Sequence, residues 1–127
     1  MKRIILVLLG LMIAIVASKT VAQTSEGSIA GSWYAEDLDE SVIEVIQLKD
    51  GSYEGVIKSS SKEKYVGHKV IYGFKYNAAE KQYEGTISSA ARNMEMSGTI
   101  VLEKNGKLKL TGRKFMISKT FYWERRN

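Results

Sequence analysis

The feature that most constrains this chain is an alternation of apolar and polar residues with a period of two, repeated between short turn signals. Successive side chains of a β-strand point to opposite faces, so this alternation predicts strands with one buried face. Asp50-Gly51 and Asn105-Gly106 are pairs typical of tight hairpin turns. The pattern predicts about eight strands, over residues 32–36, 42–49, 53–58, 68–76, 82–88, 94–103, 107–113 and 119–126.

No convincing helix pattern accompanies these strands. An antiparallel sheet with one apolar face and no covering helix must close on itself or fold over as a sandwich. Gly55, Gly85, Gly98 and Gly112 recur on the apolar faces, where a missing side chain lets a strand bend sharply. We therefore expect an all-β fold, a single small antiparallel up-and-down β-barrel of about eight strands, with a two-sheet sandwich as the alternative.

The N-terminal segment has the layout of a secretory signal peptide. Lys2 and Arg3 precede an uncharged apolar run over residues 4–17, followed by small residues. The run is short against the roughly 20 residues of a membrane-spanning helix, which disfavours a retained anchor. The sequence predicts a signal peptide over residues 1–22, a barrel domain over residues 23–127, and a periplasmic or secreted location.

Removal of the signal peptide changes the charge balance. The whole chain has a net charge of +5, but Lys2, Arg3 and Lys19 belong to the signal, which leaves 16 Lys and Arg against 14 Asp and Glu. Both signs are interspersed along the mature chain, whereas a nucleic-acid interface needs clustered positive charge. We expect no nucleic-acid partner and no stable membrane span after signal cleavage.

The composition also restricts the chemistry. The chain has no cysteine and a single histidine, His68, so a thiolate site and a multi-histidine metal site are excluded within one chain. The acidic residues between 36 and 40 lack the spacing of a calcium loop and are interpreted as a solvated turn. We expect no catalytic residues, no metal and no cofactor, and the protein is predicted not to be an enzyme.

Short motifs follow one another in a characteristic order along the mature chain. They are Gly31-Ser32-Trp33, the echoed Tyr53-Glu54-Gly55 and Tyr83-Glu84-Gly85, Leu108-Lys109-Leu110-Thr111-Gly112, and Trp123-Glu124-Arg125. In this order the chain resembles the bacterial "domain of unknown function 2147" family, whose members are exported and similar in fold to lipocalins, or calycins. The resemblance implies a barrel and brings no established activity.

The same resemblance implies a structural plug at one end of the barrel. In lipocalin-like barrels a Gly-x-Trp on the first strand meets a basic residue on the last strand. Here the matching residues are Gly31 and Trp33 on the first strand, with Trp123 and Arg125 on the last. A guanidinium stacked on an indole ring suits such a plug.

The aromatic face of the fourth strand is the best candidate for ligand binding. Tyrosine combines apolar area with a hydroxyl group, and methionine adds adaptable apolar wall. The predicted lining of the barrel interior is Tyr53, Tyr72, Phe74, Tyr76, Tyr83, Met94 and Met96. The alternative is a filled core, because side chains alone can fill an eight-stranded barrel. The inward glycines favour empty volume instead.

A basic and aromatic cluster occupies the C-terminal hairpin, with Arg113, Lys114 and Lys119 interleaved with Phe115 and Phe121. Such a mixture can bind single-stranded nucleic acid or an anionic lipid surface, and a solvated hairpin is the simpler interpretation. Three functional hypotheses remain for the exported protein, of which an enzyme is the least favoured. One is non-enzymatic binding of a small hydrophobic or amphipathic ligand inside the barrel. Another is an envelope structural or protein-interaction module with a filled core and an unknown protein partner.

Overall fold

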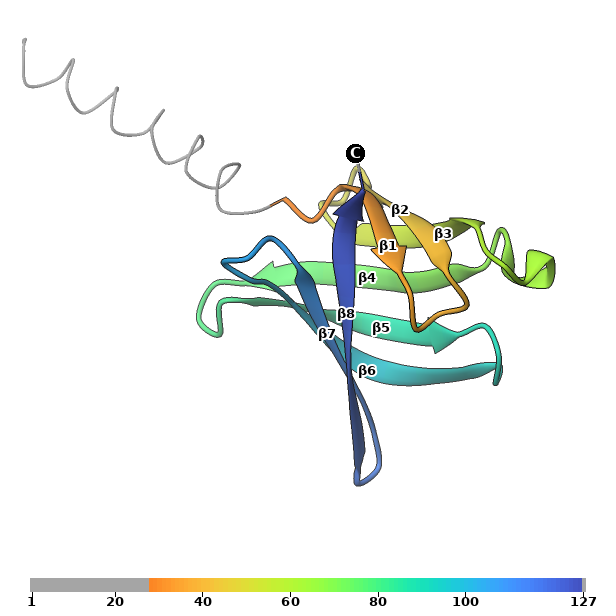
Figure 1. Cartoon of the computed structure of the whole chain (residues 1–127). Helices are drawn as coiled ribbons and strands as arrows, with labels where there is room; N and C mark the ends of the chain where they lie inside the picture. The colour runs from red at the N-terminus through yellow and green to blue at the C-terminus, as the bar shows by residue number, and fades with distance from the viewer. Residues whose placement is uncertain (1–27, 127) are drawn as a thin grey trace, which may run out of the picture.

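The structure, a computed structural model, describes residues 28–126. The predicted signal peptide lies outside the described residues. Eight strands and one short 3-10 helix make up the described chain (Figure 1). In chain order they are β1 (Gly31–Ala35), β2 (Ser41–Gln47), β3 (Tyr53–Ser59), η1 (Glu63–Tyr65), β4 (Lys69–Asn77), β5 (Gln82–Ser89), β6 (Met94–Leu102), β7 (Leu108–Lys114) and β8 (Ile117–Arg126).

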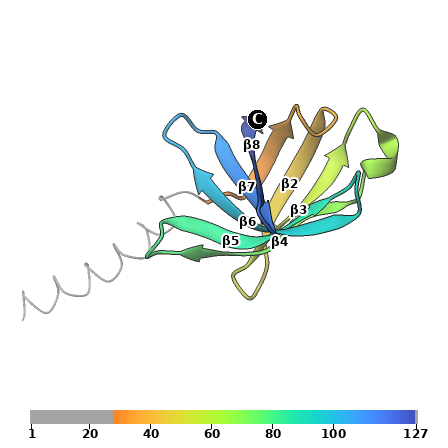
Figure 2. The same cartoon turned by 90° about the horizontal axis from the view of Figure 1, so that it is seen from below.

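The strands form a closed antiparallel barrel in which each strand pairs with the next one in sequence. β1 pairs with β8 to complete the ring, with Trp33 opposite Arg125. This confirms the predicted up-and-down barrel and excludes the sandwich. Figures 1 and 2 show η1 outside the ring of strands. Among the described residues, strand pairing runs from Gly31 to Arg126, and these pairs close the barrel.

The up-and-down topology gives the barrel two ends with different connections. The end of the barrel that carries the β1–β2, β3–β4, β5–β6 and β7–β8 connections is called the open end. The closed end has the β2–β3, β4–β5 and β6–β7 hairpins and the segment before β1. The two predicted hairpin turns, Asp50-Gly51 and Asn105-Gly106, both lie at the closed end.

A row of glycines crosses the inner face of three neighbouring strands. Gly85 on β5 pairs with Gly98 on β6, which pairs with Gly112 on β7. A Cβ atom at Gly85 would lie 2.7 Å from the Phe74 ring, and one at Gly98 would lie 2.5 Å from Cγ1 of Ile87. The expectation that these glycines leave volume empty is therefore wrong, because side chains from neighbouring strands occupy the space.

β4 departs from the predicted alternation, which placed Val70, Tyr72, Phe74 and Tyr76 on one inward face. Register shifts interrupt its pairing with both β3 and β5, and Gly73 has a positive φ of 68°. Such bulges add a residue to one strand and re-aim the side chains that follow. As a result Ile71 and Phe74 are fully buried, while Tyr72 is turned to the outer face and its hydroxyl donates a hydrogen bond to the Glu95 carboxylate.

The C-terminal hairpin is longer than predicted. β7 continues to Lys114 and β8 begins at Ile117, which leaves only Phe115 and Met116 in the turn. Phe115 has a positive φ of 57°. The turn was missed because it lacks the glycine, asparagine or aspartate that usually marks this backbone conformation.

The close packing over the glycine row predicts that an added side chain on the inner face of β6 destabilises the barrel. Gly98→Ala places a methyl group against Ile87, and overpacking of this kind typically costs about 1–3 kcal/mol of unfolding free energy. Ser97→Ala, on the exposed outer face of the same strand, is the matched control and should change stability by less than about 0.5 kcal/mol. Urea unfolding measures the free energy of unfolding of both variants. If Gly98→Ala changed it as little as Ser97→Ala, the inner face would have space for the added methyl group.

Candidate functional site

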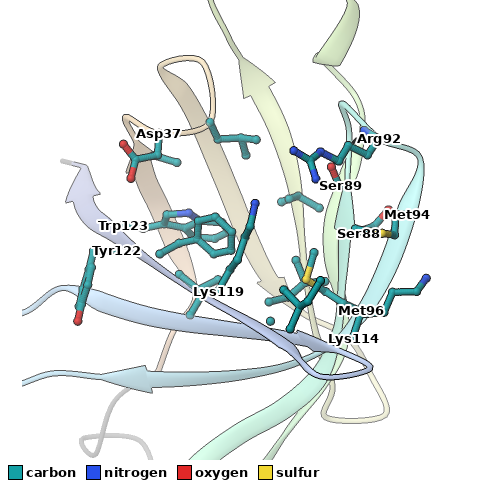
Figure 3. Close-up of a pocket in the computed structure, with 18 of the residues that line it drawn as sticks. Asp37, Ser88, Ser89, Arg92, Met94, Met96, Lys114, Lys119, Tyr122 and Trp123 are labelled. Atoms are coloured by element: carbon teal, nitrogen blue, oxygen red, sulfur yellow. Dashed lines mark hydrogen bonds between the residues drawn. The ribbon is translucent and has the colours of Figure 1, made fainter.

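The barrel is hollow at its open end, where a pocket of about 390 Å³ opens to solvent (Figure 3). Its volume falls within the usual range of about 300–1,000 Å³ for small-molecule sites. The wall is mainly apolar. It consists of Ala35, Leu38, Val70, Ile87, Met94, Met96, Leu110, Gly112, Phe115, Ile117, Phe121, Tyr122 and Trp123, together with the polar residues Asp37, Ser88, Ser89, Arg92, Lys114 and Lys119.

The β7–β8 hairpin supplies the largest share of this wall. Period-two alternation along β8 turns Ile117, Lys119, Phe121 and Trp123 to the same face, and Phe121 pairs with the buried Leu110 of β7. Trp123 is 4% exposed and lies deepest of the four. Tyr122 also contributes to the wall and is half exposed.

The floor of the pocket is where the filled part of the barrel ends. A Cβ atom at Gly112 would overlap the sulfur atom of Met96, so Met96 lies directly against the backbone of β7. Ile87 covers Gly98 next to it, and both Ile87 and Met96 face the pocket. The barrel is therefore neither fully filled nor fully hollow, which combines the two predicted alternatives.

Two cationic side chains lie at the mouth. Lys119 pairs with Gly112 on the inner side of β8, and Figure 3 shows it and Arg92 directed toward the space between them. Within residues 28–126 neither forms an ion pair with a carboxylate. Lys114 is engaged differently, because its Nζ atom donates to the carbonyl oxygen of Glu95 at 3.1 Å. Asp37 is the one carboxylate in the wall.

The structure divides the predicted lining residues into three groups. Met94 and Met96 line the pocket. Phe74 is fully buried in the filled part of the barrel, and Tyr72 lies on the outer face. The remaining residues, Tyr53, Tyr76 and Tyr83, gather in the closed half of the barrel. The predicted aromatic cavity is therefore not a single site, because the bulges of β4 separate its members.

The closed-end tyrosines form an edge-to-face cluster. Ring centroids of Tyr53 and Tyr83 are 5.5 Å apart, and those of Tyr76 and Tyr83 are 5.0 Å apart. Burial, followed by the charges that Tyr53 and Tyr76 would carry, raises the pKa of Tyr83 to about 12. The Tyr83 phenol therefore keeps its proton at neutral pH and cannot act as a general base. Its ring packs edge to face against Tyr53 and Tyr76.

Gly31, Trp33 and Arg125 come together where β1 meets β8. The Arg125 guanidinium carbon lies 4.1 Å from the Trp33 ring centroid, and its Nη1 atom donates to the carbonyl oxygen of Ala30 at 2.8 Å. Trp33 is fully buried and donates from Nε1 to the carbonyl oxygen of Ile29 at 2.9 Å. A side chain at Gly31 would meet Arg125 Nη1 at 2.8 Å. Trp123 lies in the pocket wall and takes no part in this stack.

His68 connects two strands at the open end. Its Nε2 atom lies 3.1 Å from the carbonyl oxygen of Ser88 and 3.1 Å from the Ser88 hydroxyl oxygen. Ser88 lines the pocket, whereas His68 does not. His68 therefore holds the wall residue Ser88 in place without lining the pocket itself.

Sequence reasoning missed the contributions of Arg92, Lys119, Phe121 and Trp123 to the pocket. The period-two rule applied backwards from Trp123 places Phe121 and Lys119 on its face, so the signal was present for β8. It was obscured because a lysine on a strand is normally interpreted as facing solvent. Arg92 lies in the β5–β6 turn, for which alternation makes no prediction.

Comparison with known proteins identifies the family. Residues 31–125 match the family described as an uncharacterized protein conserved in bacteria, domain of unknown function 2147, or DUF2147. The chain belongs to the DUF2147 family. This confirms the resemblance noted from the motifs. No curated protein and no solved structure matches the chain.

The family description specifies no activity, so the function of this DUF2147 protein has to be inferred from its own residues. In the described range 28–126, no three His, Cys, Asp or Glu side chains gather as metal ligands would. No helix in that range is long and apolar enough to cross a membrane. The pocket at the open end is a concave site with a mainly apolar wall, and it is the site that we consider for function.

The stack between β1 and β8 can be tested separately from the pocket. Arg125→Met removes the cation–π contact and the hydrogen bond to Ala30, which should lower the unfolding free energy by about 1–2 kcal/mol. Arg126→Met is the matched control, because Arg126 stacks 4.8 Å from the ring centroid of Tyr34 and does not contact Trp33. It should cost about 0.5 kcal/mol or less. Similar losses in urea unfolding would contradict a special role for Arg125.

Proposed function

We propose that this DUF2147 protein is an exported, non-enzymatic binding protein for a small amphipathic ligand, whose apolar part occupies the pocket at the open end. The observation that carries the proposal is the hollow half of the barrel, about 390 Å³ in volume, with a mainly apolar wall. A typical ligand site combines such a wall with a few well-placed polar groups. Here those groups are Lys119 and Arg92 at the mouth.

The charge at the mouth supports an anionic head group on the ligand. Lys119 and Arg92 have no carboxylate partner within residues 28–126 and face each other across the opening. A carboxylate or phosphate between them would accept charge-assisted hydrogen bonds from both side chains. Because the mouth is solvated, these bonds contribute less than buried ones. The head group therefore adds selectivity, and the apolar chain supplies most of the affinity.

Export is part of the proposal and rests on the sequence. Residues 1–22 have the charged start, apolar run and small-residue end of a cleavable signal. The absence of cysteine from the chain is compatible with any redox compartment. A periplasmic or secreted location brings the protein to the cell envelope, where amphipathic molecules with acyl chains are abundant.

The alternative function, an interaction module with a filled core, receives less support. Its premise is a solid barrel, and side chains fill only the part that holds Phe74 and the glycine row. The open half is hollow.

The two tryptophans of the chain allow a direct test of where a ligand binds. Trp123 lines the pocket, whereas Trp33 is fully buried beneath Arg125. We expect a medium-chain fatty acid brominated on its acyl chain to quench Trp123 emission in the Trp33→Phe variant, because bromine quenches on close approach. Trp33 emission in the Trp123→Phe variant should stay nearly constant. Fluorescence titration of the chain from Gln23 measures both.

The same acid without bromine controls for changes of environment, and thermal unfolding confirms that both variants are folded. Equal quenching of the two tryptophans would place the acid elsewhere than in the pocket. A complete lack of quenching by brominated chains of several lengths would contradict an apolar ligand.

The head-group selectivity depends on Lys119. Lys119→Met removes the charge and keeps an unbranched side chain of similar length. We expect the Kd for decanoate to rise about three- to tenfold at low salt, because one exposed charge-assisted contact is lost. The Kd for the uncharged decanol should not change. Lys104→Met, an equal charge change in the β6–β7 turn, is the matched control. An equal loss for decanol would mean that Lys119 acts by shape alone.

A further inference from the structure

The tip of the β7–β8 hairpin exposes three consecutive large apolar side chains. Phe115 is 94% exposed, Met116 is 100% exposed and Ile117 is 66% exposed. Figure 1 shows that this hairpin extends well beyond the other strands. We call these three residues the hairpin tip. Contiguous exposed apolar groups of this kind usually mark an interaction site.

Folding alone does not account for the hairpin tip. The other two tight hairpin turns of the barrel use Asp50-Gly51 and Asn105-Gly106, in which glycine takes up the positive φ. The tip instead holds Phe115 at a φ of 57°, a conformation that is unfavourable for a bulky residue. The side chains of Phe115 and Met116 bury almost nothing in return. The tip therefore has a cost in stability that some interaction outside the barrel would offset.

All charged side chains of the hairpin that lie near the tip are positive. Arg113, Lys114 and Lys119 flank it, and residues 113–120 contain no Asp or Glu. The Glu95 carboxylate of β6 offsets only part of this charge, which leaves an excess of positive charge around the tip. Lys114 bonds to a carbonyl oxygen of β6, and the nearby Glu95 carboxylate accepts a hydrogen bond from Tyr72. Within residues 28–126 none of the three cations forms an ion pair.

We propose that the hairpin tip inserts into the surface of an anionic phospholipid membrane, with the flanking cations on the lipid phosphates. Apolar side chains at the acyl boundary combined with Lys and Arg at the head-group level are the chemistry of interfacial binding. A protein partner is a poorer match. A stable protein interface covers about 800 Å² on each side, far more than three side chains at a turn offer.

The tip adjoins the mouth of the pocket, because Phe115 and Ile117 also belong to the pocket wall. Membrane docking through the tip therefore brings the mouth against the lipid surface. This consequence rests on the proposed function, whereas docking itself does not. An amphipathic ligand then exchanges between bilayer and pocket without crossing bulk water.

Sedimentation with lipid vesicles tests the docking, using the chain from Gln23, which contains the complete barrel. The vesicles contain phosphatidylcholine with or without roughly one third phosphatidylglycerol as the anionic lipid. We expect binding to the anionic vesicles to be at least about tenfold stronger than to phosphatidylcholine alone, and to weaken as salt is raised.

The decisive variant is Phe115→Gly/Met116→Ser. Glycine relieves the positive φ at position 115, so this variant should unfold at the same or a higher temperature while its vesicle binding falls about tenfold or more. Ile46→Ser/Leu48→Ser is the matched control, since it removes two partly exposed apolar side chains near the closed end. Its vesicle binding should equal that of the unchanged chain.

Two results would overturn the proposal. One is vesicle binding that the tip variant retains in full. The other is a lack of binding by the unchanged chain, including the case in which the tip instead mediates a dimer detected by analytical ultracentrifugation. Met116→Ser separates docking from ligand binding, because Met116 lies outside the pocket wall. It should weaken vesicle binding several-fold and leave the quenching of Trp123 by brominated acid unchanged.

Discussion

The interior of an eight-stranded barrel is only just wide enough to be filled by side chains. The positions of the large inward-facing side chains therefore decide which part of the barrel is filled. In this protein those positions depend on the row formed by Gly85, Gly98 and Gly112. Because the row has no side chains, Phe74 and Ile87 can lie across it. Bulk is concentrated toward one end of the barrel, and the pocket begins where the row is covered.

The two ends of the barrel consequently have different chemistry. At the closed end, the Asp50-Gly51 and Asn105-Gly106 turns have glycine at the position of positive φ. The neighbouring Arg125–Trp33 stack joins the first strand to the last. The open end combines an apolar cavity, an exposed apolar turn, and two cations, Lys119 and Arg92, that form no ion pair within residues 28–126. The side chains around a cavity lack van der Waals contacts on one side, which lowers stability. The close packing of the filled half offsets that loss of stability. The structure thus separates the residues that hold the barrel together from those available to a ligand.

Alternation predicted the strands, their order and the closure of the barrel, because burial of one face requires a period of two in every strand. It failed at β4, where the bulges near Gly73 are not encoded by alternation, and Tyr72 was assigned to the wrong face as a result. It also failed for the pocket. Lys119 faces inward against the usual preference of a charged side chain, and Arg92 comes from a turn. Tertiary pairing decides both positions.

The position of the hairpin tip beside the pocket would lower the free-energy cost of releasing an acyl chain. Release of an acyl chain into water costs about 0.8 kcal/mol for each methylene group, so tight binding of a long chain implies slow release into water. Contact between the mouth and a bilayer removes most of that cost, because the chain passes from one apolar environment to another. Phe115 and Ile117 belong both to the pocket wall and to the tip. An apolar path from the cavity to the membrane would therefore be continuous through side chains of one hairpin.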